Sequence, residues 1–188
     1  AQTARVAFSP LKFRPHRDFL VWCLASSAFG GAAAMSGPFF SVWYLRDLHF
    51  DYLTLSIALS ATVLGSIVFI KFWGRLADNY GTSKVLWISG LMITIIPLPY
   101  IFFSDPRLIW LFNFYSGATW AGYNMANFNH LLAATEKRQR SHYIAFASLV
   151  GGGLGFVFTL LGGFLATRLP PLNGYSLRSL FLLSAVFR

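Results

Sequence analysis

Residues 53–73 read LTLSIALSATVLGSIVFIKFW, and the only charge among them is Lys71, close to the end of the run. The hydrocarbon core of a bilayer is about 30 Å thick, so a helix that rises 1.5 Å per residue needs roughly 20 apolar residues to cross it. Because lipid offers no hydrogen-bond partners, the backbone of such a run must pair with itself, as a helix does. The run therefore predicts a transmembrane helix.

Further runs of this kind lie on both sides of it, and the last begins near Leu177 and is cut off at Arg188. We expect an all-α polytopic membrane protein with five complete transmembrane helices and the start of a sixth. Residues 1–18 are a basic lead-in that we expect to be cytoplasmic or to be the central loop of a longer protein. The predicted spans are 19–45, 53–73, 85–103, 108–133, 143–167 and, incomplete, 177–188.

The composition supports a membrane protein. Hydrophobic residues make up 56% of the chain and charged residues 11%, against about 25% charged in soluble domains. The net charge of +9 does not indicate nucleic-acid binding, because the basic residues gather at the ends of the apolar runs. The single Cys23 lies inside an apolar run and predicts no disulfide. The sequence has no metal-spaced Cys/His set, phosphate-binding loop or nucleophile elbow, so we expect no metal, no cofactor and no enzyme.

Basic residues divide unequally between the two ends of the predicted spans. Ten lie on the side of the N-terminus and of the loops at 71–84 and 134–142, and four lie on the other side. Since Lys and Arg are enriched in cytoplasmic loops, the larger group predicts a cytoplasmic N-terminus. We expect the protein to lie in the plasma (inner) membrane. The larger group is Arg5, Lys12, Arg14, Arg17, Lys71, Arg75, Lys84, Lys137, Arg138 and Arg140.

The loop between the second and third spans, residues 73–86, reads WGRLADNYGTSKVL. It resembles the signature of the major facilitator superfamily (MFS), roughly G-x-L-A-D-R-x-G-R-R/K-x-x-L, which follows the second helix of each six-helix half. Asn79, Thr82 and Ser83 stand where the signature is usually basic, and Lys84 supplies a cation near its end. The matching positions are Gly74, Leu76, Ala77, Asp78, Gly81 and Leu86.

The resemblance implies a half of a transporter, and the altered signature and basic lead-in favour the C-terminal half. It also implies that the loop acts as a conformational latch, formed by Gly74, Arg75, Asp78, Gly81 and Lys84, against the other half. Asp78 can pair with Arg75 or Lys84 or face a helix N-terminus, and Gly81 suits a turn with positive φ. The alternative is that these residues are ordinary solvated loop charges and a turn glycine.

Small residues recur every four positions in two of the predicted spans. In lipid, small residues let helix backbones approach closely. We expect Gly30 in the first span and Gly151, Gly155 and Gly163 in the fifth to be packing positions. Pro38 should kink the first span or weaken its hydrogen bonding.

The fourth predicted span carries a polar face. Asn113, Trp120, Asn124 and Asn127 fall within a sector of roughly 80° at about 100° per residue, and amides that face lipid would be costly. One interpretation is a substrate cavity wall with amide groups and an aromatic platform. The alternative is hydrogen bonding between helices without a ligand.

These observations predict a secondary transporter that moves a small solute by alternating access, with membrane lipid, the missing six-helix half and an unknown small-molecule substrate as partners. No complete span carries a central carboxylate, so the sequence does not reveal a coupling ion. Arg188, if buried in a sixth span, could bind an anionic group or pair with an acid elsewhere. The alternative function is a non-transporting MFS-like subunit or assembly factor.

Overall fold

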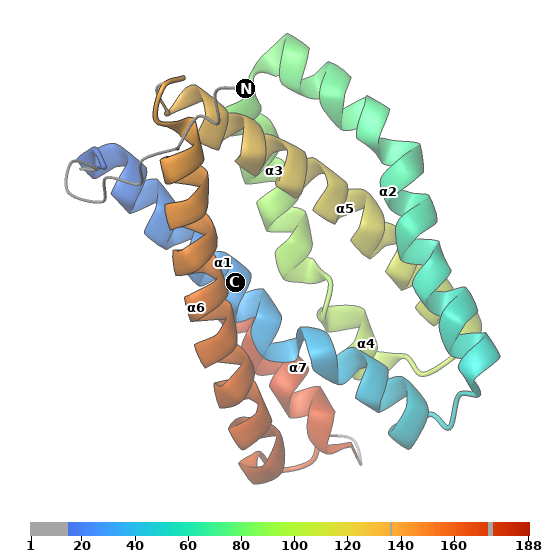
Figure 1. Cartoon of the computed structure of the whole chain (residues 1–188). Coiled ribbons are helices and arrows are strands. Elements are labelled where there is room, and N and C mark those ends of the chain that lie inside the picture. Colours follow the sequence, from blue (N-terminus) through green and yellow to red (C-terminus); the bar gives the residue numbers. More distant parts are fainter. Residues whose placement is uncertain (1–14, 136, 173–174) are drawn as a thin grey trace, which may run out of the picture.

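The structure is a computed structural model that describes residues 15–135, 137–172 and 175–188. The predicted lead-in, residues 1–18, falls mostly outside this part of the chain. The secondary-structure elements of the described residues are all helices (Figure 1). This confirms the prediction of an all-α fold. In chain order the elements are α1 (Arg17–Val42), the π-helical turn η2 (Trp43–Asp47), α2 (Tyr52–Tyr80), α3 (Thr82–Ile95), α4 (Leu98–Phe102), α5 (Pro106–Ala133), α6 (Arg140–Arg168) and α7 (Ser176–Phe187).

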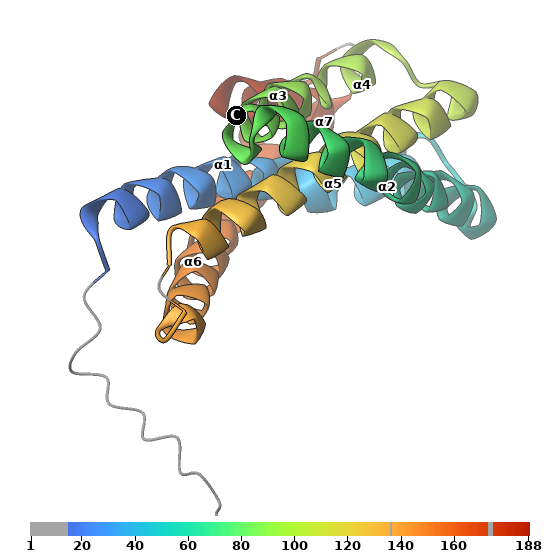
Figure 2. The same ribbon diagram turned by 90° about the horizontal axis from the view of Figure 1, so that it is seen from above.

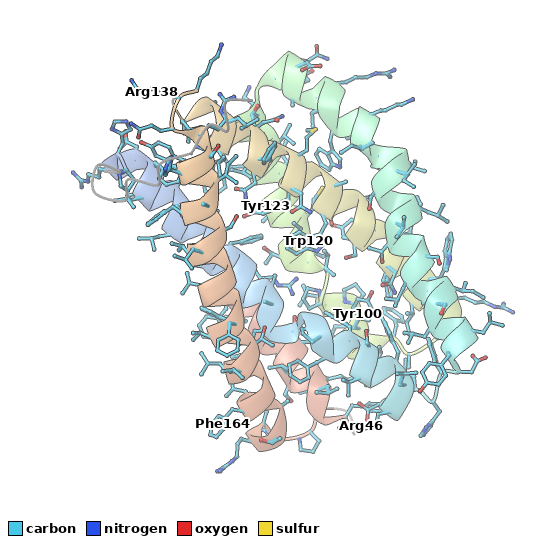
Figure 3. All side chains as sticks on the ribbon, in the orientation of Figure 1. Arg46, Tyr100, Trp120, Tyr123, Arg138 and Phe164 are labelled. Carbon is cyan, nitrogen blue, oxygen red and sulfur yellow. The ribbon has the colours of Figure 1, made fainter. Side chains whose placement is uncertain are left out.

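Two long helix pairs organise the bundle. Helix α2 packs along α5, and α1 packs along α6 (Figure 1). Seen from above, α3, α4 and α7 lie on one side of α1 and α5, and α6 lies on the other (Figure 2). Arg138 and Arg46 lie at opposite ends of the bundle (Figure 3).

Four described helical segments are long and apolar enough to cross a membrane, by length and composition: residues 17–47, 52–80, 82–102 and 140–168. Helix α5 has 28 residues, but its amides and glycines make it less apolar. Its membrane crossing therefore stays a prediction. The predicted span 85–103 corresponds to α3 and α4 together, which are divided near Pro97 and Pro99 because proline lacks the N–H that a continuous helix needs.

Glycines bring α2 and α5 into backbone contact. A Cβ placed on Gly117 of α5 would lie 2.6 Å from the carbonyl carbon of Thr62 in α2, and a Cβ on Gly65 would lie 3.0 Å from the carbonyl carbon of Phe114. The Trp73 indole N–H then donates across the same interface to the Ala118 carbonyl at 2.7 Å. These contacts explain why the two helices stay together along most of their length.

The predicted glycine stripe of α6 contacts α1 only in part. A Cβ on Gly151 would lie 3.6 Å from Ser27 and one on Gly163 would lie 3.7 Å from Phe39. Nothing lies within 4 Å of the corresponding position at Gly155 or Gly30. The tightest α1–α6 contact is at the neighbouring Gly162, whose Cβ would lie 3.0 Å from the carbonyl carbon of Met35.

Pro38 lies in α1 and leaves a backbone acceptor open. Because proline has no N–H, the carbonyl of Ala34 four residues earlier has no helical donor. The Thr159 hydroxyl of α6 donates to that carbonyl at 3.3 Å. Helix α1 therefore continues through Pro38 while α6 satisfies the acceptor that the proline frees.

Candidate functional site

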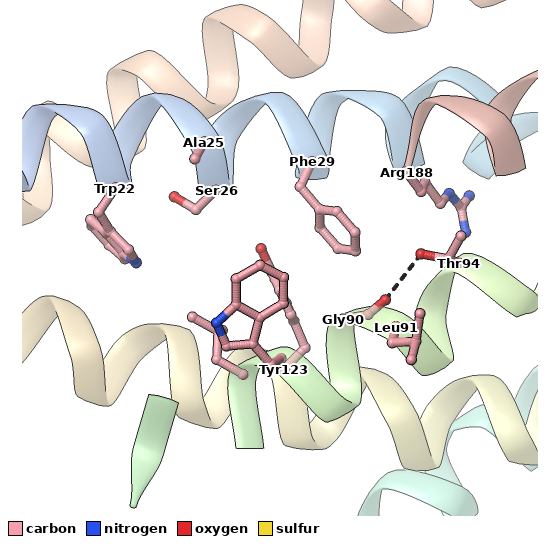
Figure 4. A pocket seen from close by; sticks show the side chains of 11 residues that line it. Trp22, Ala25, Ser26, Phe29, Gly90, Leu91, Thr94, Tyr123 and Arg188 are labelled. Carbon is pink, nitrogen blue, oxygen red and sulfur yellow. Dashed lines mark hydrogen bonds between the residues drawn. The ribbon is translucent and has the colours of Figure 1, made fainter. Parts of the chain in front are cut away.

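A cavity of about 290 Å³ lies between α1, α3 and α5, with Arg188 beside it (Figure 4). Trp22 and Phe29 of α1 and Tyr123 of α5 supply most of its aromatic surface. The Phe29 and Tyr123 rings pack against each other across the two helices, with centroids 4.9 Å apart. Pockets of this size with apolar walls and a few polar groups are typical of small-molecule sites.

The polar groups on the cavity wall differ in what they can offer a ligand. The Ser26 and Thr94 hydroxyls donate to carbonyls of their own helices, at 3.2 Å each. The Trp22 indole N–H and the Arg188 Nε are buried and have no partner among the described residues. The cavity wall thus carries hydroxyl, indole and guanidinium donors and no carboxylate, which suits an apolar molecule that carries acceptors.

The rest of the Arg188 guanidinium is held by polar groups of other helices. It donates to the Ile93 carbonyl at 3.3 Å and to the Ser36 hydroxyl at 2.9 Å. Ser36 in turn lies 2.9 Å from Ser184 of α7. The two binding modes expected for Arg188, an anionic group or an acid elsewhere, stay predictions, because in the described residues its partners are carbonyls and a hydroxyl.

Asn113, the first of the predicted cavity residues, takes part in a buried hydrogen-bond network between helices. Its amide donates to the Tyr44 hydroxyl at 3.0 Å and to the Ile109 carbonyl at 2.9 Å, and it accepts from Thr62 at 3.3 Å. The π-helical turn η2 carries Tyr44, so this network joins η2, α2 and α5. For Asn113 the structure matches the alternative reading, hydrogen bonding between helices.

The other three predicted cavity residues lie farther along α5. Trp120 is half-buried and packs edge-on against Tyr123, with ring centroids 5.7 Å apart (Figure 3). Asn124 is exposed and makes no hydrogen bond within the described chain. Asn127, one turn beyond Tyr123, has a buried carbonyl oxygen without a partner. Unlike the Asn113 amide, these two amides make no hydrogen bond within the described residues, and neither side chain lines the cavity beside Arg188.

The predicted latch residues gather at the turn between α2 and α3. Gly81 joins the two helices with φ +89°, a conformation that favours glycine, and Gly74 has open space around it. Asp78 is exposed and forms no ion pair with the described residues, Arg75 and Lys84 included. Lys84 instead lies over the Tyr80 ring, 5.8 Å from its centroid. The latch role therefore stays a prediction.

Sequence reasoning did not assign a site role to Trp22, Phe29, Tyr44 or Tyr100. Burial of Tyr44 and Tyr100, 1% and 2% exposed, follows from the break at Pro97 and the π-helical turn, which hydropathy does not reveal. Trp22 and Phe29 recur seven residues apart on α1, and that spacing is the signal that places them on one helix face.

Long apolar helices, paired through glycine contacts and carrying buried polar networks, define an all-helical polytopic membrane protein. The sequence profile of the Major Facilitator Superfamily matches residues 22–187, so this chain belongs to that superfamily. The predicted family membership is confirmed.

One curated relative is "Multidrug resistance protein MdtG" of Dickeya zeae (strain Ech586), to which the chain is 30% identical over 176 residues. The match covers 89% of this chain and 40% of that protein, so the chain spans less than half the length of this relative. No solved structure matches the chain.

Proposed function

We propose that this chain is one half of a secondary transporter that moves a small, largely apolar solute by alternating access. Family membership supports transport, and the similarity to a multidrug resistance protein supports an apolar drug-like solute. The chain covers 40% of that relative, in agreement with one half of a carrier. Two halves then rock about a shared site that opens to one side of the membrane at a time.

The observation that carries this proposal is the different use of the amides on α5. Asn113 is consumed by three hydrogen bonds inside the bundle, whereas Asn124 and Asn127 keep free amide groups beside the aromatic surface of Trp120 and Tyr123. A buried amide oxygen without a partner costs about 1–3 kcal/mol. A solute that donates to Asn127 recovers that free energy, and the aromatic rings bind its apolar part.

The outer faces of the helix pairs support the need for a second half. Large apolar side chains of α6 are exposed: Leu149 by 74%, Phe156 by 65% and Phe164 by 59%. No residue in the most apolar 18-residue stretch of α6 is buried. Lipid and the missing half are the two environments in which such a face is stable. The half-carrier arrangement places the α2–α3 turn, with Asp78 and Gly81, against the other half as a latch on the cytoplasmic side.

Transport by the full-length carrier that contains this chain, reconstituted in proteoliposomes, tests the site. In proteoliposomes, efflux of a panel of apolar fluorescent amines and carboxylates is measured for the wild type and for the double variant Asn124→Leu and Asn127→Leu. We expect about a tenfold loss of transport, because two hydrogen bonds of about 0.5–1.5 kcal/mol each disappear. The matched control is Asn129→Leu, an exposed amide on another face of the same helix. Unchanged transport by the double variant would contradict the cavity assignment.

The latch is tested separately through Asp78→Asn. Cysteines introduced at both ends of the bundle report whether the inward-open or the outward-open state dominates. A shift in their accessibility toward one state supports the latch, and equal accessibility in variant and wild type removes it. If all variants assemble normally with their partners and the full-length wild-type protein moves no solute in either direction, the chain belongs to a non-transporting subunit.

A further inference from the structure

A second hollow lies between α2, α3 and α5, on a different part of the bundle from the cavity beside Arg188. It is a groove of about 850 Å³, and every side chain along it is apolar or aromatic. Helix α2 lines it from Phe69 to Leu76, the α3–α4 segment from Ile88 to Pro99, and α5 from Leu111 to Ala118.

The polar atoms of this groove are already satisfied. The Trp73 indole N–H donates to the Ala118 carbonyl at 2.7 Å, and the Tyr115 hydroxyl donates to the Met92 carbonyl at 3.1 Å. The groove therefore presents no free donor or acceptor along its length and suits a purely hydrocarbon occupant.

Large side chains line this groove. Phe69, Phe72, Phe112 and Phe114 project along it, whereas helices that pack in lipid meet through small residues. The groove is thus shaped for a flexible chain rather than for another helix.

A basic residue lies at one end of the groove. Lys84 is one turn before Ile88 on α3 and, at about 100° per residue, shares its face of the helix. Tyr80 is one turn after Leu76 on α2, and the Lys84 ammonium lies 5.8 Å from the Tyr80 ring centroid. Both side chains are exposed, and Lys84 forms no ion pair with the part of the chain that the structure describes. The Lys84 ammonium, which has no carboxylate partner among the described residues, thus lies at the end of the apolar groove where α2 meets α3.

We propose that this groove binds an acyl chain of an anionic phospholipid whose phosphate lies at Lys84 and Tyr80. An anionic headgroup supplies the counter-charge that Lys84 lacks, and basic pockets between transmembrane helices bind such headgroups. Tyr80 is an aromatic residue of the kind that lies at the level of headgroups. The bound lipid fills the space between α3 and the α2–α5 pair.

Native mass spectrometry of the purified protein, exchanged into mixed micelles with equal amounts of phosphatidylglycerol and phosphatidylethanolamine, tests the proposal. We expect the wild type to retain one phosphatidylglycerol in preference to phosphatidylethanolamine. Lys84→Gln should lower that preference about fivefold, the ratio that corresponds to about 1 kcal/mol per basic residue near a membrane surface. The matched control is Lys71→Gln, because Lys71 points about 150° away from the groove residues of α2 and should keep the preference.

A second variant tests the groove without changing its charge. Ile88→Trp places a bulky ring into the groove from a side chain that is 46% exposed, and it should lower retention of both lipids. Val68→Trp is its control, because Val68 is 59% exposed on α2 and does not line the groove. Equal loss in Lys84→Gln and Lys71→Gln, equal retention in Ile88→Trp and Val68→Trp, or retention of annular lipid only would overturn the proposal.

Discussion

The α2–α5 contact gives the sharpest test of the fold, through Gly117→Ala. A Cβ at this position would lie 2.6 Å from the carbonyl carbon and 2.8 Å from the Cα of Thr62. The shorter distance is about 0.8 Å below the 3.4 Å at which ordinary van der Waals contact begins. Both atoms belong to the backbone, so no side-chain rotation relieves the clash. The two helices must separate locally.

The magnitude follows from two opposing effects. Overpacking a close contact costs about 1–3 kcal/mol, and up to about 1 kcal/mol is recovered because alanine favours a helix more than glycine does. We expect a net loss of about 2 kcal/mol in the free energy of unfolding. For a chain of this size that lowers the unfolding temperature by about 4–8 °C.

The single cysteine provides the assay. Cys23 is 1% exposed in the folded bundle, so a fluorogenic maleimide labels it only when the chain opens, and a thermal ramp in detergent reports the midpoint. The control is Gly152→Ala on α6, where nothing lies within 4 Å of the added methyl group, and its midpoint should stay equal or rise slightly. Identical midpoints for the two variants would refute the close backbone approach of α2 and α5.

Three further changes test other parts of the structure. Asn113→Leu removes the interhelical hydrogen bonds to Tyr44 and Thr62. Because such bonds average about 0.6 kcal/mol in membranes, the midpoint of Cys23 labelling should fall by about 1–4 °C. A midpoint equal to that of the wild type would show that the network adds no stability. Thr159→Val leaves the Ala34 carbonyl, which Pro38 frees, without a donor, so hydrogen exchange in this part of α1 should become faster. The control is Thr167→Val: the Thr167 hydroxyl donates within α6, so hydrogen exchange in α1 should stay unchanged. Hydrogen bonds from the hydroxyl and the backbone N–H of Thr54 lower the pKa of Asp51, so this N-cap stabilises the start of α2 at neutral pH. The stabilisation is lost as the pH falls below about 4 through the lowered pKa. Protection of the first turn of α2 from hydrogen exchange should fall over that range, and Asp51→Asn should abolish the pH dependence.

Hydropathy predicted the helices well because each long run must satisfy its own backbone in lipid, whatever its neighbours are. It could not predict which helices pair. The glycines that fix α2 against α5, Gly65 and Gly117, lie in different spans and show no common period along the chain. The visible four-residue stripe on α6 was a weaker guide, because its close contact with α1 comes from Gly162, one residue out of register with it.

The site was harder to predict for a related reason. Helical periodicity places Asn113, Asn124 and Asn127 on one face of α5, but it does not show what each part of that face meets. Near one end the face meets Tyr44, because the π-helical turn after α1 carries that side chain to the α2–α5 pair. Beyond Tyr123 no described side chain donates to α5 in this way at Asn127, whose amide oxygen stays without a partner. The same residue type is therefore fully hydrogen-bonded within the bundle at one position and left without a partner at another.

Helix α1 is where the constraints on movement converge. Three consecutive carbonyls, of Ala32, Ala33 and Ala34, accept hydrogen bonds from Ser184, Arg188 and Thr159 of other helices. In hydrocarbon no water is present to donate to the Ala34 carbonyl that Pro38 leaves without a helical donor. Separating α6 from α1 at Thr159 would therefore leave this acceptor unpaired, at a cost of about 1–3 kcal/mol. Between α2 and α5 the corresponding constraint is the backbone contact at Gly117. Each helix pair is therefore held by contacts within it, and the cavity lies between α1 of one pair and α5 of the other, where Phe29 and Tyr123 meet through ring contact alone.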